Sequence, residues 1–144
     1  VKIEYPTKQE EKAMLNLLTT STDFDSIKIE EVLNREKIET IKEIIKNIHI
    51  DEKLMDYILE IVFKTRETNN YIACGASPRA SIALVVSAKA NAFLEGREYV
   101  MPQDIKRVIF DVLRHRIMLT YEAEAEGKNV EDIISGIMEE VKLP

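Results

Sequence analysis

A nearly continuous apolar segment over residues 80–94 constrains the fold of this chain most strongly. It follows Ser77 and Pro78, which are favoured at a helix N-cap and at the first helical position. Gly96 lies two residues after the segment ends, and glycine is typical of the position just past a helix C-terminus. The pattern predicts one helix, and because its apolar residues lie almost all round, we expect it to be the buried central helix of a domain.

Amphipathic helical patterns lie on both sides of this segment. Apolar residues recur at spacings of three and four, which indicates helices that bury one face. The expected faces are Ile38, Ile41, Ile44, Ile45 and Ile48 in one helix and Leu54, Tyr57, Ile58, Ile61 and Val62 in the next. Only four glycines and four prolines occur among 144 residues, which argues against a turn-rich β-sandwich or barrel. We predict an all-α bundle of about six helices. Its expected N-caps are Thr7 with Glu10 in a capping box, Asn34, Asp51, Ser77 and Asn129 with Asp132 at the third position. A short acidic helix opens at Thr120 or Tyr121 and ends at Gly127.

The first five residues carry a different pattern. Val1, Ile3 and Tyr5 alternate with charged residues, which predicts a short strand. Because a lone strand in a helical chain has nothing to pair with, we interpret it as the last strand of a sheet outside this sequence. The chain also begins with valine rather than methionine, and we expect it to be an excised piece of a longer protein.

Charge and cysteine content narrow the possible functions. The net charge of −6 argues against a general nucleic-acid binder, which usually has a basic excess. Residues 77–118 nevertheless hold seven basic and four acidic side chains, which suggests a local anionic partner. The single cysteine, Cys74, excludes an intrachain disulfide and favours a reducing compartment. No apolar run approaches the ~18 residues that a membrane-spanning helix requires.

The sequence has no recognisable catalytic centre. It lacks the glycine-rich loops that bind nucleotide phosphates, the paired histidines of zinc proteases and an EF-hand loop. The two histidines, His49 and His115, have no cysteine or acidic cluster beside them, so we expect structural or solvent-facing roles and no metal site. Cys74 lacks an evident base, and we do not expect it to be a nucleophile.

The segment Gly75-Ala-Ser-Pro-Arg-Ala80 is the most informative for function. Arg79 falls at the second helical position, where the positive end of the helix dipole disfavours a cation. An anion would offset this, because free backbone N–H groups and a guanidinium together can bind phosphate. A nearby carboxylate would offset it as well, and on the pattern alone a carboxylate partner is the preferred interpretation. Gly75 leaves room for a ligand or a backbone to approach closely.

Four blocks follow one another in the second half of the chain. They are Gly75-Ala-Ser-Pro-Arg-Ala80, Glu95-Gly-Arg-Glu-Tyr-Val-Met-Pro-Gln-Asp104, Val112-Leu-Arg-His-Arg116 and Glu122-Ala-Glu-Ala-Glu-Gly127. This succession resembles the C-terminal helical lid of the MoxR family of AAA+ ATPases. Tyr5-Pro6 and residues 51–66 fit the same family, so the resemblance covers essentially the whole chain.

The resemblance implies a division of the chain and a role for its main site. Residues 1–18 would be the end of the AAA+ nucleotide-binding core, 19–29 a linker with a candidate hinge, and 30–144 the helical lid. Arg79 would match the sensor-2 arginine that points at the γ-phosphate of ATP, with Gly75, Ser77 and Pro78 beside it at the cofactor. Mg²⁺ would be bound mainly by the core, which this sequence lacks together with the Walker motifs, so we expect this chain alone not to hydrolyse ATP.

The resemblance also implies the setting of the whole protein. It would be a cytoplasmic, chaperone-like ATPase that forms homo-hexameric rings and assists maturation or metal insertion of a client protein that the sequence does not identify. A stand-alone helical interaction module without nucleotide is the alternative. A helix-turn-helix DNA binder that uses residues 97–116 is a third interpretation, which the net charge argues against.

Two charged runs each allow two interpretations. Arg114-His115-Arg116 could contact a neighbouring subunit or nucleotide, although a solvated helix end, where cations suit the dipole, is the preferred interpretation. The acidic run Glu122, Glu124 and Glu126 is interpreted as a solvated face, with a client-docking surface as the alternative.

Overall fold

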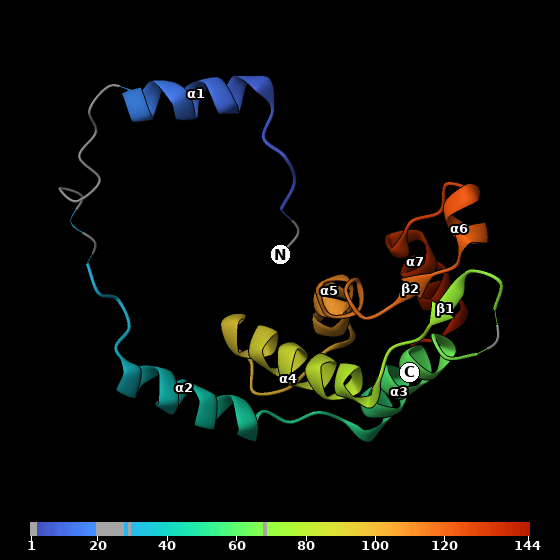
Figure 1. Cartoon of the computed structure of the whole chain (residues 1–144). Coiled ribbons are helices and arrows are strands. Elements are labelled where there is room, and N and C mark those ends of the chain that lie inside the picture. Colours follow the sequence, from blue (N-terminus) through green and yellow to red (C-terminus); the bar gives the residue numbers. More distant parts are fainter. Residues whose placement is uncertain (1–2, 20–27, 29, 68) are drawn as a thin grey trace. The chain divides into compact units, whose positions relative to one another are not determined.

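The computed structural model (Figure 1) describes residues 3–19, 28, 30–67 and 69–144. The chain divides into two compact units, Val1–Ile38 and Glu39–Pro144, which are taken separately below. The elements are α1 (Lys8–Thr19), α2 (Arg35–Asn47), α3 (Glu52–Lys64), β1 (Ile72–Cys74), α4 (Pro78–Leu94), α5 (Pro102–Leu113), β2 (Met118–Leu119), α6 (Tyr121–Ala125) and α7 (Val130–Glu140). Helices dominate, and the predicted all-α class is confirmed.

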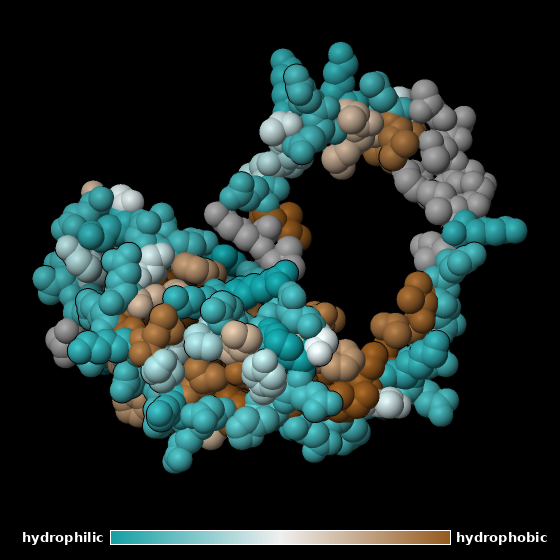
Figure 2. All heavy atoms as spheres, turned by 180° about the vertical axis from the view of Figure 1, so that it is seen from behind, coloured by the Kyte–Doolittle hydropathy of each residue, from teal (hydrophilic) through white to brown (hydrophobic). Residues whose placement is uncertain are grey.

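Helix α1 is the main element of the first unit. The Thr7 N–H donates to Glu10 Oε2 at 2.7 Å and the Glu10 N–H donates to Thr7 Oγ1 at 3.3 Å, which confirms the predicted capping box. Apolar side chains lie along one side of α1 in Figure 2, and its leucines and Met14 are exposed. Residues 3–7 have no regular secondary structure. The strand expected over residues 1–5 is therefore not seen among the described residues and stays a prediction, since a strand exists only when paired.

The linker expected at 19–29 falls largely on residues 20–27 and 29, which lie outside the described part of the chain. Helix α2 begins after Asn34, whose side-chain oxygen accepts from the Lys37 N–H at 2.8 Å, as predicted. Its expected apolar face is mostly accessible, with Ile38 and Ile44 exposed, while Ile48 beyond its end is buried in the core. The extended residues after it form a parallel bridge between His49 and Tyr99.

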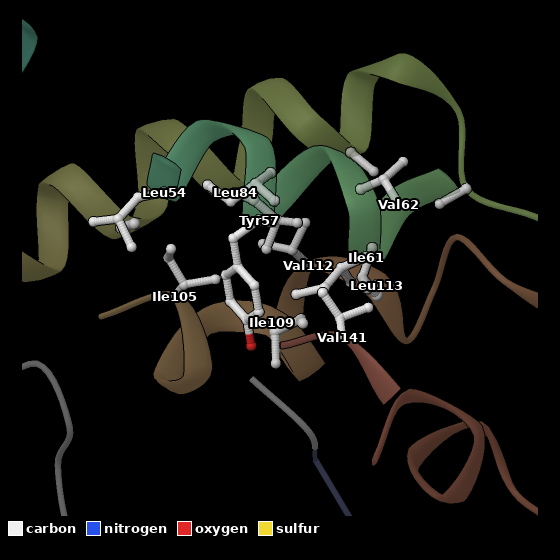
Figure 3. Close-up of a cluster of buried hydrophobic side chains, with 14 of the residues drawn as sticks. Leu54, Tyr57, Ile61, Val62, Leu84, Ile105, Ile109, Val112, Leu113 and Val141 are labelled. Atoms are coloured by element: carbon white, nitrogen blue, oxygen red, sulfur yellow. The ribbon is translucent and has the colours of Figure 1, made fainter. Parts of the chain in front are cut away.

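The hydrophobic core of the second unit lies between α3, α4, α5 and α7 (Figure 3). Helix α3 begins at Asp51, whose carboxylate accepts from the Lys53 N–H at 2.9 Å, and buries every residue of its predicted apolar face. Figure 3 shows Tyr57 of α3 reaching between Ile105 and Ile109 of α5. The fully buried large apolar side chains are Ile58, Ile61, Val62, Leu84, Ile105, Ile109, Leu113 and Ile134.

Helix α4 is central to this core but is not buried on every side, so that prediction is wrong. Its buried residues, Ala80, Leu84, Ala88 and Ala92, recur every four positions and form a single stripe. The three alanines allow close packing, and α5 and α3 are its main neighbours. On another side, Ile82 and Val86 are 65% and 54% exposed, because none of the described elements covers them.

Two short strands were not predicted. β1 and β2 pair antiparallel, with Ile72 opposite Leu119 and Cys74 opposite Met118. Strands of three and two residues are too short to show an alternating pattern, which explains why the sequence did not reveal them. The pair connects the segment before α4 to the segment after α5.

The predicted helix ends at Gly96, Gly127 and Asn129 are confirmed. Gly96 follows the C-cap of α4 with φ 71°, and Gly127 follows the C-cap of α6 with φ 72°, both conformations that favour glycine. Asn129 and Asp132 exchange two hydrogen bonds of 3.0 Å, which caps α7. Among the described residues no helix is both long enough and apolar enough to span a membrane.

Candidate functional site

The predicted site lies at the start of α4. Ser77 occupies the N-cap with extended backbone angles (φ −73°, ψ 167°), and Pro78 is the first helical residue. Both positions are those predicted from the sequence. The Ser77 side chain makes no capping hydrogen bond, and the first turn is closed by the Ala80 N–H donating to the Ser77 carbonyl at 2.8 Å.

Arg79 is exposed on the first turn of α4. The sequence favoured a neighbouring carboxylate as its partner, but the Arg79 side chain makes no hydrogen bond or ion pair with the described residues. The guanidinium therefore stands in water near the positive end of the helix dipole, where an anion would be favourable. Chemically, this end of α4 can donate hydrogen bonds to a phosphate or a carboxylate from outside the described residues.

Gly75 is required by a close approach of two backbone segments. A Cβ atom at this position would lie 2.2 Å from the Thr65 carbonyl oxygen and 2.7 Å from its carbonyl carbon. Of the two explanations that the sequence allowed, a ligand or a backbone, the structure shows the backbone. Gly75 thus brings the segment before α4 against the C-terminal end of α3.

Two residues that the sequence analysis missed hold this segment in place. Thr65 is 0% exposed, and its hydroxyl donates to the Val62 carbonyl at 2.6 Å and accepts from the Ala76 N–H at 2.9 Å. Arg66 Nε donates to the Ala76 carbonyl at 2.7 Å. The glycine before Ala76 was the only sequence signal of this contact, and it did not indicate which backbone approaches.

The basic run after α5 has structural contacts. Arg114 Nε donates to Glu131 at 2.6 Å and its Nη1 to Asp111 at 3.0 Å, which ties α5 to α7 and raises the pKa of Arg114. Arg116 donates to the carbonyl of Val112 and so satisfies the last turn of α5. His115 is exposed. The preferred interpretation, a solvated helix end, fits His115 alone, because Arg114 and Arg116 are half-buried and hydrogen-bonded within the chain.

A buried carboxylate stabilises the second block of the resemblance. Asp104 is 1% exposed and accepts from Arg97 at 2.6 and 2.8 Å, from Asn91 at 2.7 Å and from the Met101 N–H at 2.7 Å. Burial alone would raise the pKa of Asp104, but the hydrogen bonds and the charge of Arg97 outweigh it, so the pKa lies below its ordinary value. This network fixes the turn between α4 and α5.

The other candidate groups do not form a site among the described residues. Cys74 is a free, exposed thiol on β1, and His49 takes part in a backbone bridge. No group of three or more metal-ligating side chains occurs in that part of the chain. Glu122, Glu124 and Glu126 are all exposed, as expected for a solvated face.

Several known proteins are similar to this chain over its whole length. The family model described as the AAA lid domain matches residues 64–137, a range that holds Thr65, Gly75 and Arg79. Chaperone MoxR1 of Mycobacterium tuberculosis is 33% identical over 152 residues, covering 100% of this chain and 39% of that protein. The uncharacterized protein YeaC of Bacillus subtilis is 38% identical over 144 residues, covering 100% of this chain and 44% of that protein.

A solved structure is also similar. The crystal structure of a candidate ATPase from Cytophaga hutchinsonii superimposes with a TM-score of 0.83 and 36% sequence identity, covering 99% of this chain and 45% of that one. The chain thus spans about two fifths of the length of the relatives it matches, and it aligns with their C-terminal part. The chain belongs to the AAA lid domain family, and its relatives are MoxR-type proteins.

Proposed function

We propose that this chain is the lid of a MoxR-like AAA+ ATPase and that it closes over ATP bound to the core domain of the same protein. Arg79 is proposed as the sensor-2 arginine, which donates hydrogen bonds to the γ-phosphate. The observation that carries this proposal is the exposed Arg79 guanidinium at the start of α4, without an ion-pair partner among the described residues. Its place within the matched lid region supports the same role.

The residues present fit part of a nucleotide site. A guanidinium beside a helix start suits a phosphate oxygen, because both present N–H donors and positive charge. Gly75, Ser77 and Pro78 shape the backbone that carries Arg79. No cluster of metal ligands exists in the described part of the chain, so we assign Mg²⁺ mainly to the core domain.

The chemical contribution of Arg79 would be electrostatic. In phosphoryl transfer the protein chiefly positions groups and neutralises developing charge. Because the γ-phosphate is present in ATP and absent in ADP, a contact with it also couples the position of the lid to the nucleotide state. We further propose that the whole protein is a cytoplasmic, homo-hexameric, chaperone-like ATPase that acts on a client protein in maturation or metal insertion.

The test uses the full-length ATPase that carries this lid. Arg79→Ala should lower ATP turnover about ten- to a hundredfold, because a hydrogen bond to a charged group contributes roughly 1.5–3 kcal/mol. Arg107→Ala is the matched control, since Arg107 is an exposed arginine of α5 that pairs with Glu95 at 2.6 Å. Arg107→Ala should leave turnover within about twofold of the unmodified protein. Unchanged turnover in Arg79→Ala would remove Arg79 from the mechanism.

A second candidate function rests on a different observation. A shallow apolar groove of about 290 Å³ lies between α3 and α4, lined by Met55, Ile58, Leu59, Ser81, Ile82, Val85 and Val86. Such a surface suits the alternative of an interaction module that binds a partner without nucleotide. Binding of a partner that is equally tight with ATP, with ADP and without nucleotide would favour the module. Binding that requires ATP would favour the lid.

A further inference from the structure

Ala76, two residues before α4, is hydrogen-bonded to the two residues that follow α3. Its N–H donates to the Thr65 hydroxyl at 2.9 Å, and its carbonyl accepts from Arg66 Nε at 2.7 Å. Both backbone groups of Ala76 are therefore held by consecutive side chains directly after α3. Ala76 is itself 1% exposed, so water does not easily replace these partners.

The threonine hydroxyl both donates and accepts a hydrogen bond in this arrangement. It donates its proton to the Val62 carbonyl in the last turns of α3 at 2.6 Å, which leaves its lone pairs to accept from Ala76. The hydroxyl thus joins the last turns of α3 to the segment before α4. A methyl group in its place would leave the Ala76 N–H buried without an acceptor.

Arg66 adds a second, more accessible link. Its guanidinium lies 4.8 Å from the centre of the Phe63 ring on α3, a contact that fixes the side chain in the direction of Ala76. Arg66 is exposed, in contrast to Thr65. The two links can therefore be removed separately, one from the interior and one from the surface.

We propose that Thr65 and Arg66 are positioning residues for Arg79. This inference rests on the proposed function, because it assigns them a role in placing the guanidinium that contacts the nucleotide. Arg79 lies three residues after Ala76, across the rigid Ser77-Pro78 step. The two hydrogen bonds of Ala76 therefore tie the start of α4, which carries Arg79, to the end of α3.

The main test compares two substitutions of Thr65 in the full-length ATPase. Thr65→Val removes the hydroxyl at nearly constant volume, whereas Thr65→Ser keeps it. We expect Thr65→Val to lower kcat for ATP hydrolysis about tenfold, since small displacements of a catalytic group have effects of this order. Thr65→Ser should leave kcat within about twofold of the value for the unmodified protein. Equal losses in both variants would show that the side-chain volume matters and the hydroxyl does not, which would overturn the proposal.

A double-mutant cycle separates positioning from general stability. If Thr65 acts through Arg79, the variant carrying Thr65→Val and Arg79→Ala should be no slower than Arg79→Ala alone. Additive losses would overturn the proposal. Thr120→Val is the matched control, because the Thr120 hydroxyl likewise joins two backbone segments, donating to Asn70 at 2.6 Å and accepting from Ala123 at 3.2 Å. Thr120 lies away from α4 in the sequence, so Thr120→Val should leave kcat within about twofold of the value for the unmodified protein.

Arg66→Met gives a test at an exposed position, where loss of folding is not expected. It keeps an apolar stem on Phe63 and removes the Nε donor, and we expect a fall in kcat of about threefold that is also absent in the Arg79→Ala background. A fall that persists in that background would contradict the positioning role of Arg66.

Hydrogen exchange distinguishes failure of this inference from failure of the proposed function. In the full-length protein, Thr65→Val should speed hydrogen exchange of the Ala76 amide tenfold or more, whether or not Arg79 contacts the nucleotide. Unchanged exchange would refute the link through Thr65. Unchanged turnover in Arg79→Ala, together with faster Ala76 exchange, would refute the nucleotide role of Arg79 and with it any positioning role for Thr65.

Discussion

Gly75→Ala provides the sharpest test of how the start of α4 is held. The added Cβ would lie 2.2 Å from the Thr65 carbonyl oxygen and 3.0 Å from the Arg66 Cα, and both are backbone atoms that cannot rotate away. To reach an ordinary contact, the two segments must separate by about 1 Å. A shift of that size would lengthen the 2.9 Å and 2.7 Å hydrogen bonds of Ala76 beyond hydrogen-bonding distance.

The expected cost follows from these two effects. Overpacking costs about 1–3 kcal/mol and each lost hydrogen bond about 1 kcal/mol. We therefore expect Gly75→Ala to lower the free energy of unfolding by about 3 kcal/mol, which corresponds to a fall in Tm of roughly 15 °C for a unit of this size. Urea denaturation followed by circular dichroism measures the change.

Gly136→Ala is the matched control for this experiment. Gly136 lies within α7, and a Cβ there would meet no atom within 4 Å. Because alanine is the better helix former, this substitution should stabilise the protein by roughly 0.5–1 kcal/mol. If Gly75→Ala leaves the unfolding midpoint where it was, or raises it as Gly136→Ala should, the close backbone contact is not a feature of the protein in solution.

Two further predictions concern the core. Asp104→Asn should lower the free energy of unfolding by about 2–3 kcal/mol, because it leaves the partly buried Arg97 without its counter-charge. Since the pKa of Asp104 is lowered on folding, its contribution is fully present above the ordinary carboxyl pKa and is lost as the pH falls through that value toward the folded pKa. Urea titrations in this acidic range should show a smaller pH dependence in Asp104→Asn, and an identical dependence would contradict the assignment. On α4, Leu84→Ala should cost about 3 kcal/mol and Ile82→Ala less than about 1 kcal/mol, because Leu84 is buried and Ile82 is exposed; equal losses by chemical denaturation would mean that the exposed side is covered.

The helices could be predicted well because their signals are local. Capping residues such as Thr7, Asp51 and Asn129 satisfy backbone groups within three positions of themselves, so the sequence alone contains the whole interaction. The apolar face of α3 was likewise predicted completely, since it depends only on helical spacing.

The failures involve partners that lie far apart along the chain. The composition of α4 indicated burial all round, but exposure depends on which elements cover it, and α3 and α5 pack mainly against the Leu84 side. β1 and β2 lie more than forty residues apart and are too short to show a pattern. Thr65 was not singled out, because its acceptor role depends on Ala76 from a different segment.

The candidate site combines one feature that local signals predicted with one that depends on distant parts of the chain. The placement of Ser77, Pro78 and Arg79 at the start of α4 followed from local preferences. That no carboxylate in the described part of the chain pairs with Arg79 could not be predicted, because it depends on how every neighbouring element folds.

The ratio of ATP to ADP affinity tests the central claim most directly. Binding of a non-hydrolysable ATP analogue and of ADP to the full-length protein should be measured for Arg79→Ala, with Arg107→Ala as the control. If Arg79 contacts the γ-phosphate, Arg79→Ala should weaken binding of the ATP analogue about ten- to a hundredfold and leave the Kd for ADP nearly unchanged. Equal effects on both nucleotides, or no effect on either, would contradict the proposed role of Arg79.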